Sequence, residues 1–173
     1  MEQLFRKHIR DVNDFPKPGI VFKDITPLLH NHQAFSAAIE SFVGRYKDQK
    51  IDIVAGIESR GFLFGAPIAH QLGASFVPVR KKGKLPYKTV GISYDLEYGS
   101  ATIEMHTDAI SRGQRVLVVD DLLATGGTAG AACELIRKQG GLVIECAFVV
   151  ELAFLGGREK MKDTPIFSLV NYA

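Results

Sequence analysis

The sequence predicts an α/β protein built on a mostly parallel sheet, and two observations support this fold class. First, residues 51–57, 116–119 and 142–152 are apolar with little alternation, which is typical of parallel strands buried on both faces. Second, residues 62–72 and 129–139 carry apolar side chains at helical spacing and follow the first two of these strands. Strands that alternate with helices are expected to form a parallel sheet.

The composition is that of a soluble globular protein. The chain has 173 residues, of which 46% are hydrophobic and 23% charged, so we expect one domain over residues 1–173 with one substantial core. A net charge of +2 gives no argument for binding to nucleic acid or to a membrane. No apolar run reaches transmembrane length, and charges interrupt the first ten residues where a signal peptide needs an apolar core. We therefore expect a cytoplasmic location.

The cysteines and histidines predict neither a disulfide nor a zinc site. Cys133 and Cys146 lie in a predicted helix and a predicted strand without C-x-x-C spacing, and both are expected to be buried free thiols. The five histidines show no spacing that is typical of metal ligands.

The N-terminal third begins with a predicted amphipathic helix over residues 4–12. Residues 15–27 contain three prolines and a glycine and cannot be helical, yet they are rich in apolar side chains. Such a segment is expected to cover something; the alternative is a surface connection with Phe15 and Phe22 packed in the core. A core-facing helix over residues 34–46 follows.

Two turns after predicted strands carry basic residues. The strand at 51–57 ends in Glu58, Ser59, Arg60 and Gly61, and an arginine beside a glycine at a carboxyl edge suits a bidentate phosphate contact. A third strand at 74–79 runs into a basic loop at 80–87. Taken alone, Arg60 could equally be a solvated surface residue, and residues 80–87 could be an ordinary solvent-exposed loop.

The segment 116–128 carries the strongest functional signal. Its buried strand ends in Asp120 and Asp121, and two leucines then precede Ala124-Thr125-Gly126-Gly127-Thr128 and a helix from residue 129. A strand, a glycine turn and a helix N-terminus form an anion-binding site, because unpaired N–H groups and the helix dipole face one point. Neither a P-loop nor G-x-G-x-x-G is present. The paired acids need sugar hydroxyls or a hydrated cation opposite them, so ribose 5-phosphate fits both halves. An ordinary βα turn is the alternative.

The rest of the chain supplies further strands. Residues 93–99 and the alternating segment 101–105 suggest a flap of two strands around a loop. Two glycines at 140 and 141 end the helix after the phosphate segment. The strand at 142–152, a polar turn or short helix at 156–160 and a last strand at 166–170 complete the prediction.

The motifs resemble those of the type I phosphoribosyltransferases, and in particular of their adenine-specific members. The segment 116–128 resembles the family's signature for phosphoribosyl pyrophosphate, and residues 15–27 resemble the hood that closes over the purine. Glu58-Ser59-Arg60-Gly61 matches the pyrophosphate loop, residues 80–86 match a basic R-K-x-G-K-L-P loop, and residues 94–99 match the Y-x-L-E-Y-G end of the flexible loop. Lys23 and Glu58, where arginine and aspartate are also common, are mild departures, and Tyr87 affects only loop detail.

This resemblance implies a complete architecture. It is an open, mostly parallel twisted sheet with helices on both faces, an N-terminal hood over residues 1–30, and a flexible two-stranded flap within residues 80–105. It also implies a role for each matching residue. The catalytic residues are Glu97, Asp120 and Asp121; the 5-phosphate is bound by Ala124, Thr125, Gly126, Gly127 and Thr128; pyrophosphate by Ser59, Arg60, Arg80 and Lys84; adenine by Val21, Phe22, Lys23 and Leu152.

The implied reaction transfers the phosphoribosyl group from phosphoribosyl pyrophosphate to adenine, giving AMP and pyrophosphate in purine salvage. Glu97 would handle the proton at adenine N7, while Asp120 and Asp121 would accept the ribose hydroxyls. Mg²⁺ would be held mainly by substrate and water, and the family suggests a homodimer. Two alternatives stay open: a transferase for a 6-oxo purine or orotate, and a regulatory protein that binds nucleic acid.

Overall fold

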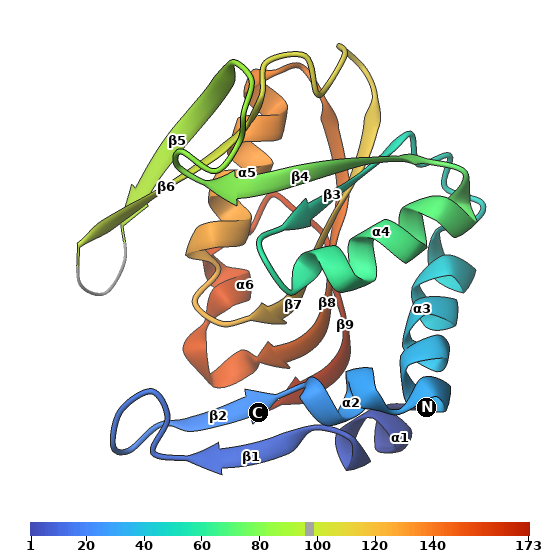
Figure 1. Ribbon diagram of the computed structural model, residues 1–173, viewed down its shortest axis with the longest axis vertical. Coiled ribbons are helices and arrows are strands. Elements are labelled where there is room, and N and C mark those ends of the chain that lie inside the picture. Colours follow the sequence, from blue (N-terminus) through green and yellow to red (C-terminus); the bar gives the residue numbers. More distant parts are fainter. Residues whose placement is uncertain (96–98) are drawn as a thin grey trace.

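The computed structural model describes residues 1–95 and 99–173, and within these residues a seven-stranded sheet forms the centre (Figure 1). The strands, in spatial order, are β5 (Thr89–Asp95), β6 (Ser100–His106), β4 (Ser75–Lys81), β3 (Ile53–Ile57), β7 (Arg115–Leu123), β8 (Leu142–Leu152) and β9 (Ile166–Tyr172). The pairs from β4 through β9 are parallel, whereas β6 pairs antiparallel with both β4 and β5. The predicted mostly parallel sheet is confirmed.

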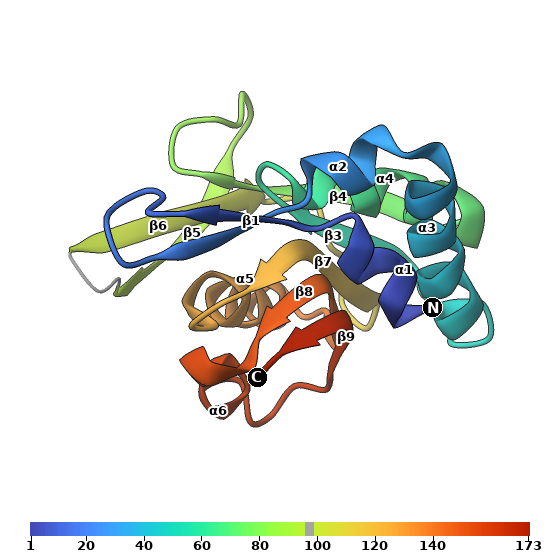
Figure 2. The ribbon, with the colours of Figure 1, turned by 90° about the horizontal axis from the view of Figure 1, so that it is seen from below.

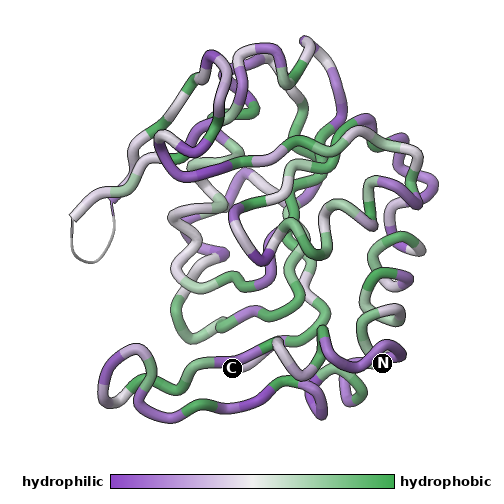
Figure 3. The backbone as a smooth tube through the Cα atoms, in the orientation of Figure 1, coloured by the Kyte–Doolittle hydropathy of each residue, from purple (hydrophilic) through white to green (hydrophobic). Residues whose placement is uncertain are grey.

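Helices cover both faces of this sheet, as Figure 2 shows. On one face, Val54, Leu117 and Val119 share a core with α3 (His32–Tyr46) and α4 (Gly61–Leu72). On the other face, Val116 and Val118 pack with α5 (Gly127–Lys138). Because neighbouring residues of β3 and β7 point to opposite cores, these strands need apolar side chains at every position. Figure 3 shows the hydrophobic stretches gathered in the central strands.

The N-terminal segment differs from the prediction. The helix expected over residues 4–12 ends early, because α1 spans Glu2–Lys7 and the chain then forms β1 (Arg10–Asn13). This strand pairs antiparallel with β2 (Val21–Asp24), and α2 (Thr26–His30) follows. The buried side chains of Phe5 and Ile9 lie four residues apart and imitate helical spacing, but pairing with β2 decides the conformation after Lys7.

The β1–β2 hairpin lies beside the end of β9 (Figure 1). Lys23 on β2 places its Nζ 4.1 Å from the centre of the Tyr172 ring, and the Arg6 guanidinium lies 4.5 Å from the same ring. These cation–π contacts join the first and last segments of the chain. The hairpin is therefore attached near the carboxyl ends of the strands.

Several boundaries shift in a way that affects the site. Strand β7 continues to Leu123, so Asp120 and Asp121 lie within the strand and not after its end. Helix α5 begins at Gly127, two residues before the predicted start. The predicted strand at 142–152 is confirmed as β8, and a short turn η1 (Ala153–Leu155) and α6 (Gly157–Lys160) follow it.

Two further predictions can be compared with the described residues. Cys133 and Cys146 are buried and free, as expected, with their sulfur atoms 3.3 Å apart. In the described parts of the chain, no helix combines the length and the apolar character needed to cross a membrane.

Candidate active site

A polar cavity of about 330 Å³ lies at the carboxyl ends of β3, β4 and β7. Its walls include the Glu58–Arg60 turn after β3, Lys81 at the end of β4, and the acids Asp120 and Asp121. Carboxyl ends of parallel strands form the ligand-binding edge of open α/β sheets. The turn and the two acids, predicted separately, thus face one space.

The two acids of β7 have different surroundings. Asp121 is 6% exposed, and its Oδ2 accepts a hydrogen bond of 2.5 Å from Nε of Arg60. Asp120 is half-buried, and its Oδ1 accepts from the backbone N–H of Asp121 at 2.9 Å. Burial, followed by the neighbouring charge of Asp121, raises the pKa of Asp120 well above its ordinary value. Asp120 therefore loses its proton less readily than an ordinary aspartate, whereas Asp121 is held in an ion pair with Arg60.

The start of α4 approaches these acids closely because of Gly61. A methyl group on Gly61 would lie 2.7 Å from the carbonyl oxygen of Val119 and 3.0 Å from Oδ1 of Asp120. The peptide bond between Glu58 and Ser59 in the same turn is cis. Gly61 thus permits the approach that brings Arg60 within hydrogen-bonding distance of Asp121.

The basic loop after β4 carries the predicted pyrophosphate contacts Arg80 and Lys84. Arg80 donates from Nε to Glu58 Oε2 at 3.1 Å and from Nη1 to the Lys84 carbonyl at 3.1 Å. Lys84 has an exposed side chain, and Lys81 lines the cavity. Successive strand residues point to opposite faces, which places Lys81 on the face of Val79 and Arg80 on the other. This alternation is the sequence signal that adds Lys81 as a candidate beside Arg80 and Lys84, whose contacts with pyrophosphate stay predictions.

Glu58 connects this loop to the turn before α4. Its Oε2 accepts from the backbone N–H of Lys81 at 2.9 Å as well as from Arg80. Burial would raise the pKa of Glu58, but these hydrogen bonds lower it below its ordinary value. Glu58 is therefore an ionised carboxylate that fixes the end of β4 beside the turn.

The predicted phosphate loop lines a second cavity of about 100 Å³. The first turn of α5 contains Gly127 and Thr128, so its unpaired N–H groups belong to the loop itself. Gly126 has a φ of +81°, and a methyl group there would lie 2.6 Å from the carbonyl oxygen of Gly157. A methyl group on Gly127 would make an ordinary contact, 3.4 Å from Tyr94. The local conformation therefore requires glycine at position 126 more than at 127.

Tyr94 joins the β5–β6 hairpin to this loop and was not predicted. Its hydroxyl lies 3.0 Å from Oγ1 of Thr128, and its side chain also lines the first cavity. The two residues are 34 positions apart, so no local pattern could have indicated the contact. Glu97, the predicted acid/base, lies outside the described residues.

A third cavity, of about 1110 Å³, separates the N-terminal hairpin from the end of β8. Its lining brings together Val21, Lys23 and Leu152, three of the four predicted adenine contacts. The fourth, Phe22, lies with its ring centre 5.5 Å from the Arg60 guanidinium and 5.2 Å from the Phe15 ring. Lys23 is paired with Asp11 at 2.7 Å. On the β1–β2 hairpin, Val21 thus lines the third cavity, whereas the ring of Phe22 contacts Arg60, which lines the first cavity.

The comparisons with known proteins decide the family. A family model described as the phosphoribosyl transferase domain matches residues 26–172. The chain belongs to this family. It is 58% identical over 164 residues to the adenine phosphoribosyltransferase of Chloroflexus aurantiacus, covering 95% of each chain, so it stands among the adenine phosphoribosyltransferases.

Solved structures of phosphoribosyltransferases have the same fold. The adenine phosphoribosyltransferase of Thermoanaerobacter pseudethanolicus matches with a TM-score of 0.96 and 49% identity, over 99% of this chain and 100% of the other. The enzyme of Saccharomyces cerevisiae, in complex with an imino-altritol bisphosphate and adenine, matches with a TM-score of 0.93 and 42% identity over 97% of each chain. The predicted resemblance is confirmed, and the 6-oxo purine, orotate and regulatory alternatives lose their support.

Proposed function

We propose that this phosphoribosyltransferase moves the 5-phosphoribosyl group of phosphoribosyl pyrophosphate to N9 of adenine, giving AMP and pyrophosphate in purine salvage. The observation that carries the assignment of sites is the continuity of the three cavities. The first and second share Asp120 and Thr128, and the second and third share Thr125. A donor with two charged ends and an acceptor base need three adjoining subsites of this kind.

The first cavity suits the leaving pyrophosphate. Breaking the C1–O bond places negative charge on pyrophosphate and positive charge on the ribose ring, so cations must face the leaving group. We assign this role to Arg60 and Lys81, with backbone groups at Ser59. Arg80 and Lys84, inferred from the family's basic loop, remain predicted contacts, although Arg80 is held by Glu58 in this structure.

The second cavity suits ribose 5-phosphate. The residues from Ala124 to Thr128 would bind the phosphate through N–H groups and hydroxyls, and Asp120 and Asp121 would accept hydrogen bonds from the ribose hydroxyls. The negative charge of Asp121 would also favour the cationic ribose ring that forms as the bond breaks. Fixing the donor in this way makes the attack by the base effectively intramolecular.

The third cavity suits adenine. The backbone of Val21 would discriminate the 6-amino edge, Leu152 would form the opposite wall, and Phe22 would stack on the ring with Lys23 nearby.

Glu97 would transfer the proton at N7 of adenine. E97Q is expected to reduce kcat by about 10²-fold or more with little change in the Kd of adenine, and a change confined to the Kd would remove this assignment.

The acids of the first cavity fit a magnesium ion bound through substrate. Within residues 1–95 and 99–173, no three His, Cys, Asp or Glu side chains converge as a metal site. Two neighbouring carboxylates beside a phosphate subsite are, however, the donor set that Mg²⁺ commonly uses through water and phosphate oxygens. Mg²⁺ would neutralise charge on the pyrophosphate, and Asp120 and Asp121 would hold its water ligands.

The proposed assembly and location of the protein rest on the family resemblance and on the sequence composition. We propose a homodimer in the cytoplasm, with residues 1–173 forming one domain and no partner among nucleic acids or membranes. Light scattering coupled to size-exclusion chromatography tests the dimer, and a mass near that of one chain would contradict it.

One assay tests the proposed reaction. Purified protein is incubated with phosphoribosyl pyrophosphate and Mg²⁺ plus adenine, hypoxanthine, guanine or orotate, and the nucleotide products are separated by chromatography. AMP is the expected product, formed with a kcat/KM at least 10³-fold above that for the other bases, because a 6-oxo group reverses the hydrogen-bonding pattern. Equal use of hypoxanthine, or no product with adenine, would overturn the proposal.

A further inference from the structure

We infer that Glu151 and Arg158 are positioning residues that hold the phosphate-binding loop, residues 124–128, in its binding conformation. The inference rests on the proposed function, since it assigns a role in binding the 5-phosphate of the donor. Neither residue lines any of the three cavities, and neither belongs to a motif of the sequence. They act through Gly157, the first residue of α6.

The two residues form a bidentate ion pair around a buried carboxylate. Glu151 is 1% exposed, and its two oxygens accept from Nε and Nη2 of Arg158 at 2.6 and 2.7 Å. The Ser168 hydroxyl donates a third bond to Oε2 at 2.7 Å. Burial would raise the pKa of Glu151, but the hydrogen bonds from Arg158 and Ser168 lower it below its ordinary value. Two parallel bonds to a planar guanidinium fix direction as well as distance.

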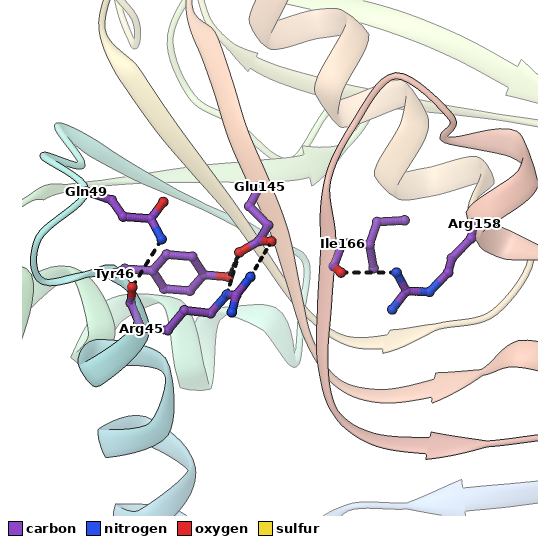
Figure 4. Close-up of polar contacts among 6 residues, drawn as sticks. All are labelled: Arg45, Tyr46, Gln49, Glu145, Arg158 and Ile166. Carbon is purple, nitrogen blue, oxygen red and sulfur yellow. Dashed lines mark hydrogen bonds and ion pairs between the residues drawn. The ribbon is translucent and has the colours of Figure 1, made fainter.

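A further bond fixes the remaining side of the guanidinium. Nη1 of Arg158 donates to the carbonyl oxygen of Ile166 at 3.1 Å, as Figure 4 shows. Arg158 therefore joins three segments: the end of β8 through Glu151, the start of β9 through Ile166, and α6, to which it belongs. Arg158 therefore links α6 to both of these strands.

The start of α6 in turn packs against the phosphate-binding loop. A methyl group on Gly126 would lie 2.6 Å from the Gly157 carbonyl oxygen, and one on Gly157 would overlap the Ala124 carbonyl oxygen. The two backbones are thus in contact with no side chain between them. Gly157 is the covalent neighbour of Arg158, so a displacement of the guanidinium moves the surface on which the loop rests.

A second ion pair on the same strand provides a matched control. Glu145 accepts from Nε and Nη2 of Arg45 at 2.7 and 2.8 Å and from the Tyr46 hydroxyl at 2.7 Å (Figure 4). Both its partners lie on α3, and it is six positions from Glu151 on β8, roughly 20 Å along the strand. The chemistry of the two pairs matches, but only the Glu151 pair is connected to the loop.

The experiment compares R158M with R45M. Each variant removes one guanidinium and leaves a buried glutamate, so both should lower the thermal unfolding temperature. Only R158M is expected to raise the KM of phosphoribosyl pyrophosphate, by about tenfold, because residues that orient a binding group typically contribute a factor of this order. The kcat of R158M at saturation should stay within about threefold of wild type, as expected for a loop that binds a nonreacting group.

The reverse reaction provides two KM values, for AMP and for pyrophosphate, whose ratio would not change through loss of stability alone. AMP carries the 5-phosphate and pyrophosphate does not, so R158M should raise the KM of AMP and leave the KM of pyrophosphate unchanged. R158K retains a positive charge near Glu151 without the planar fork, and an intermediate KM is expected. If R158M does not fold, R158K carries the comparison.

Three results would overturn the inference: an unchanged KM for phosphoribosyl pyrophosphate in R158M, or in R158K if R158M does not fold; an equal rise in the KM of AMP and pyrophosphate; or an equal rise in R45M. Failure of the proposed function is distinguishable, because the wild-type protein would then form no AMP at all. A wild-type enzyme that turns over while R158M and R45M remain kinetically alike refutes the positioning role alone.

Discussion

The two ends of β8 solve the same electrostatic problem with different consequences. Glu145 near the amino end and Glu151 at the carboxyl end are both buried. Each accepts hydrogen bonds from Nε and Nη2 of one arginine and from one hydroxyl group. At the amino end the network joins a helix to the sheet and stops there. At the carboxyl end it borders the backbone of the phosphate-binding loop. Location along the strand, and not the type of interaction, separates a structural ion pair from a functional one.

Glycines show the same difference between regions. Gly73 has a φ of +66°, yet a methyl group there would meet nothing within 4 Å. Gly61, Gly126 and Gly157, all near the carboxyl edge, would each bring a methyl group within 3 Å of backbone oxygen. At the carboxyl edge, glycine is needed for close approach of backbones, whereas at Gly73 only the turn conformation requires it.

The largest effect is expected for the acids at the carboxyl edge. D121N should reduce kcat by about 10²- to 10³-fold while the protein stays folded, because the amide removes a charge that faces both Arg60 and the developing ribose cation. Steady-state kinetics and circular dichroism measure the two properties. D52N is the control, since the Asp52 side chain accepts a bond from the backbone N–H of Arg115 at the opposite edge. Unchanged kcat in D121N, or equal losses in both variants, would contradict the role of Asp121.

A smaller effect is expected for Gly126 and Gly73, two glycines that both have a positive φ. G126A should raise the KM of phosphoribosyl pyrophosphate by about tenfold, because the methyl group must displace Gly157 from the loop. G73A should lower the free energy of unfolding by about 1 kcal/mol through backbone strain and leave the KM unchanged. The KM of G127A for phosphoribosyl pyrophosphate should lie between those of G73A and G126A. A KM for G126A no higher than that for G127A would mean that the contact with Gly157 does not shape the loop.

Two aromatic residues, Phe22 on the β1–β2 hairpin and Phe167 at the start of β9, should also differ in their effect on activity. F22L is expected to raise the KM of adenine by about tenfold, since stacking on a base contributes roughly 1–3 kcal/mol. F167L is the matched control, because Phe167 packs beneath Arg45 and against Phe42 near the start of β9. Its KM should be unchanged. Equal adenine KM values in F22L and wild type would exclude stacking by Phe22.

The smallest kinetic effect is expected at Glu145, where only stability should change. E145Q should lower the free energy of unfolding by about 2 kcal/mol at pH 7, through loss of charged hydrogen bonds to Arg45 and Tyr46. Although burial would raise the pKa of Glu145, those bonds hold it below 4.5, so the folded state binds fewer protons than the unfolded state. The stabilisation is therefore complete above pH 4.5 and declines as the pH falls below it.

Urea titrations of E145Q and wild type between pH 3 and 8 measure this dependence. The difference in the free energy of unfolding should narrow below pH 4.5, and kcat and both KM values at pH 7 should be equal. A loss of activity in E145Q would show that the amino end of β8 is coupled to the site, which would remove the contrast with Glu151.

Much of the fold and part of the site could be predicted because their signals are local. The uninterrupted apolar run of β7, the small residues that follow it, and the turn at residues 58–61 are each read from a few neighbouring positions. The end of α1 was mispredicted because residues 10–12 fit a helical pattern until β2 pairs with them. Lys81, which lines the first cavity, was not among the predicted residues, although strand alternation places it on the face of Val79.

The sequence by itself determined the central parallel strands and the family and predicted the phosphate-binding loop, since these depend on residue types at short and regular spacing. The tertiary structure decided which side chains meet: Arg60 with Asp121 across 61 positions, Tyr94 with Thr128 across 34, and Gly157 with Gly126. Such contacts arise only when the sheet sets its strand order and brings separate turns to one edge. Hydrogen bonding and close packing depend on the distance between residues in space, which the spacing of residues along the chain does not determine.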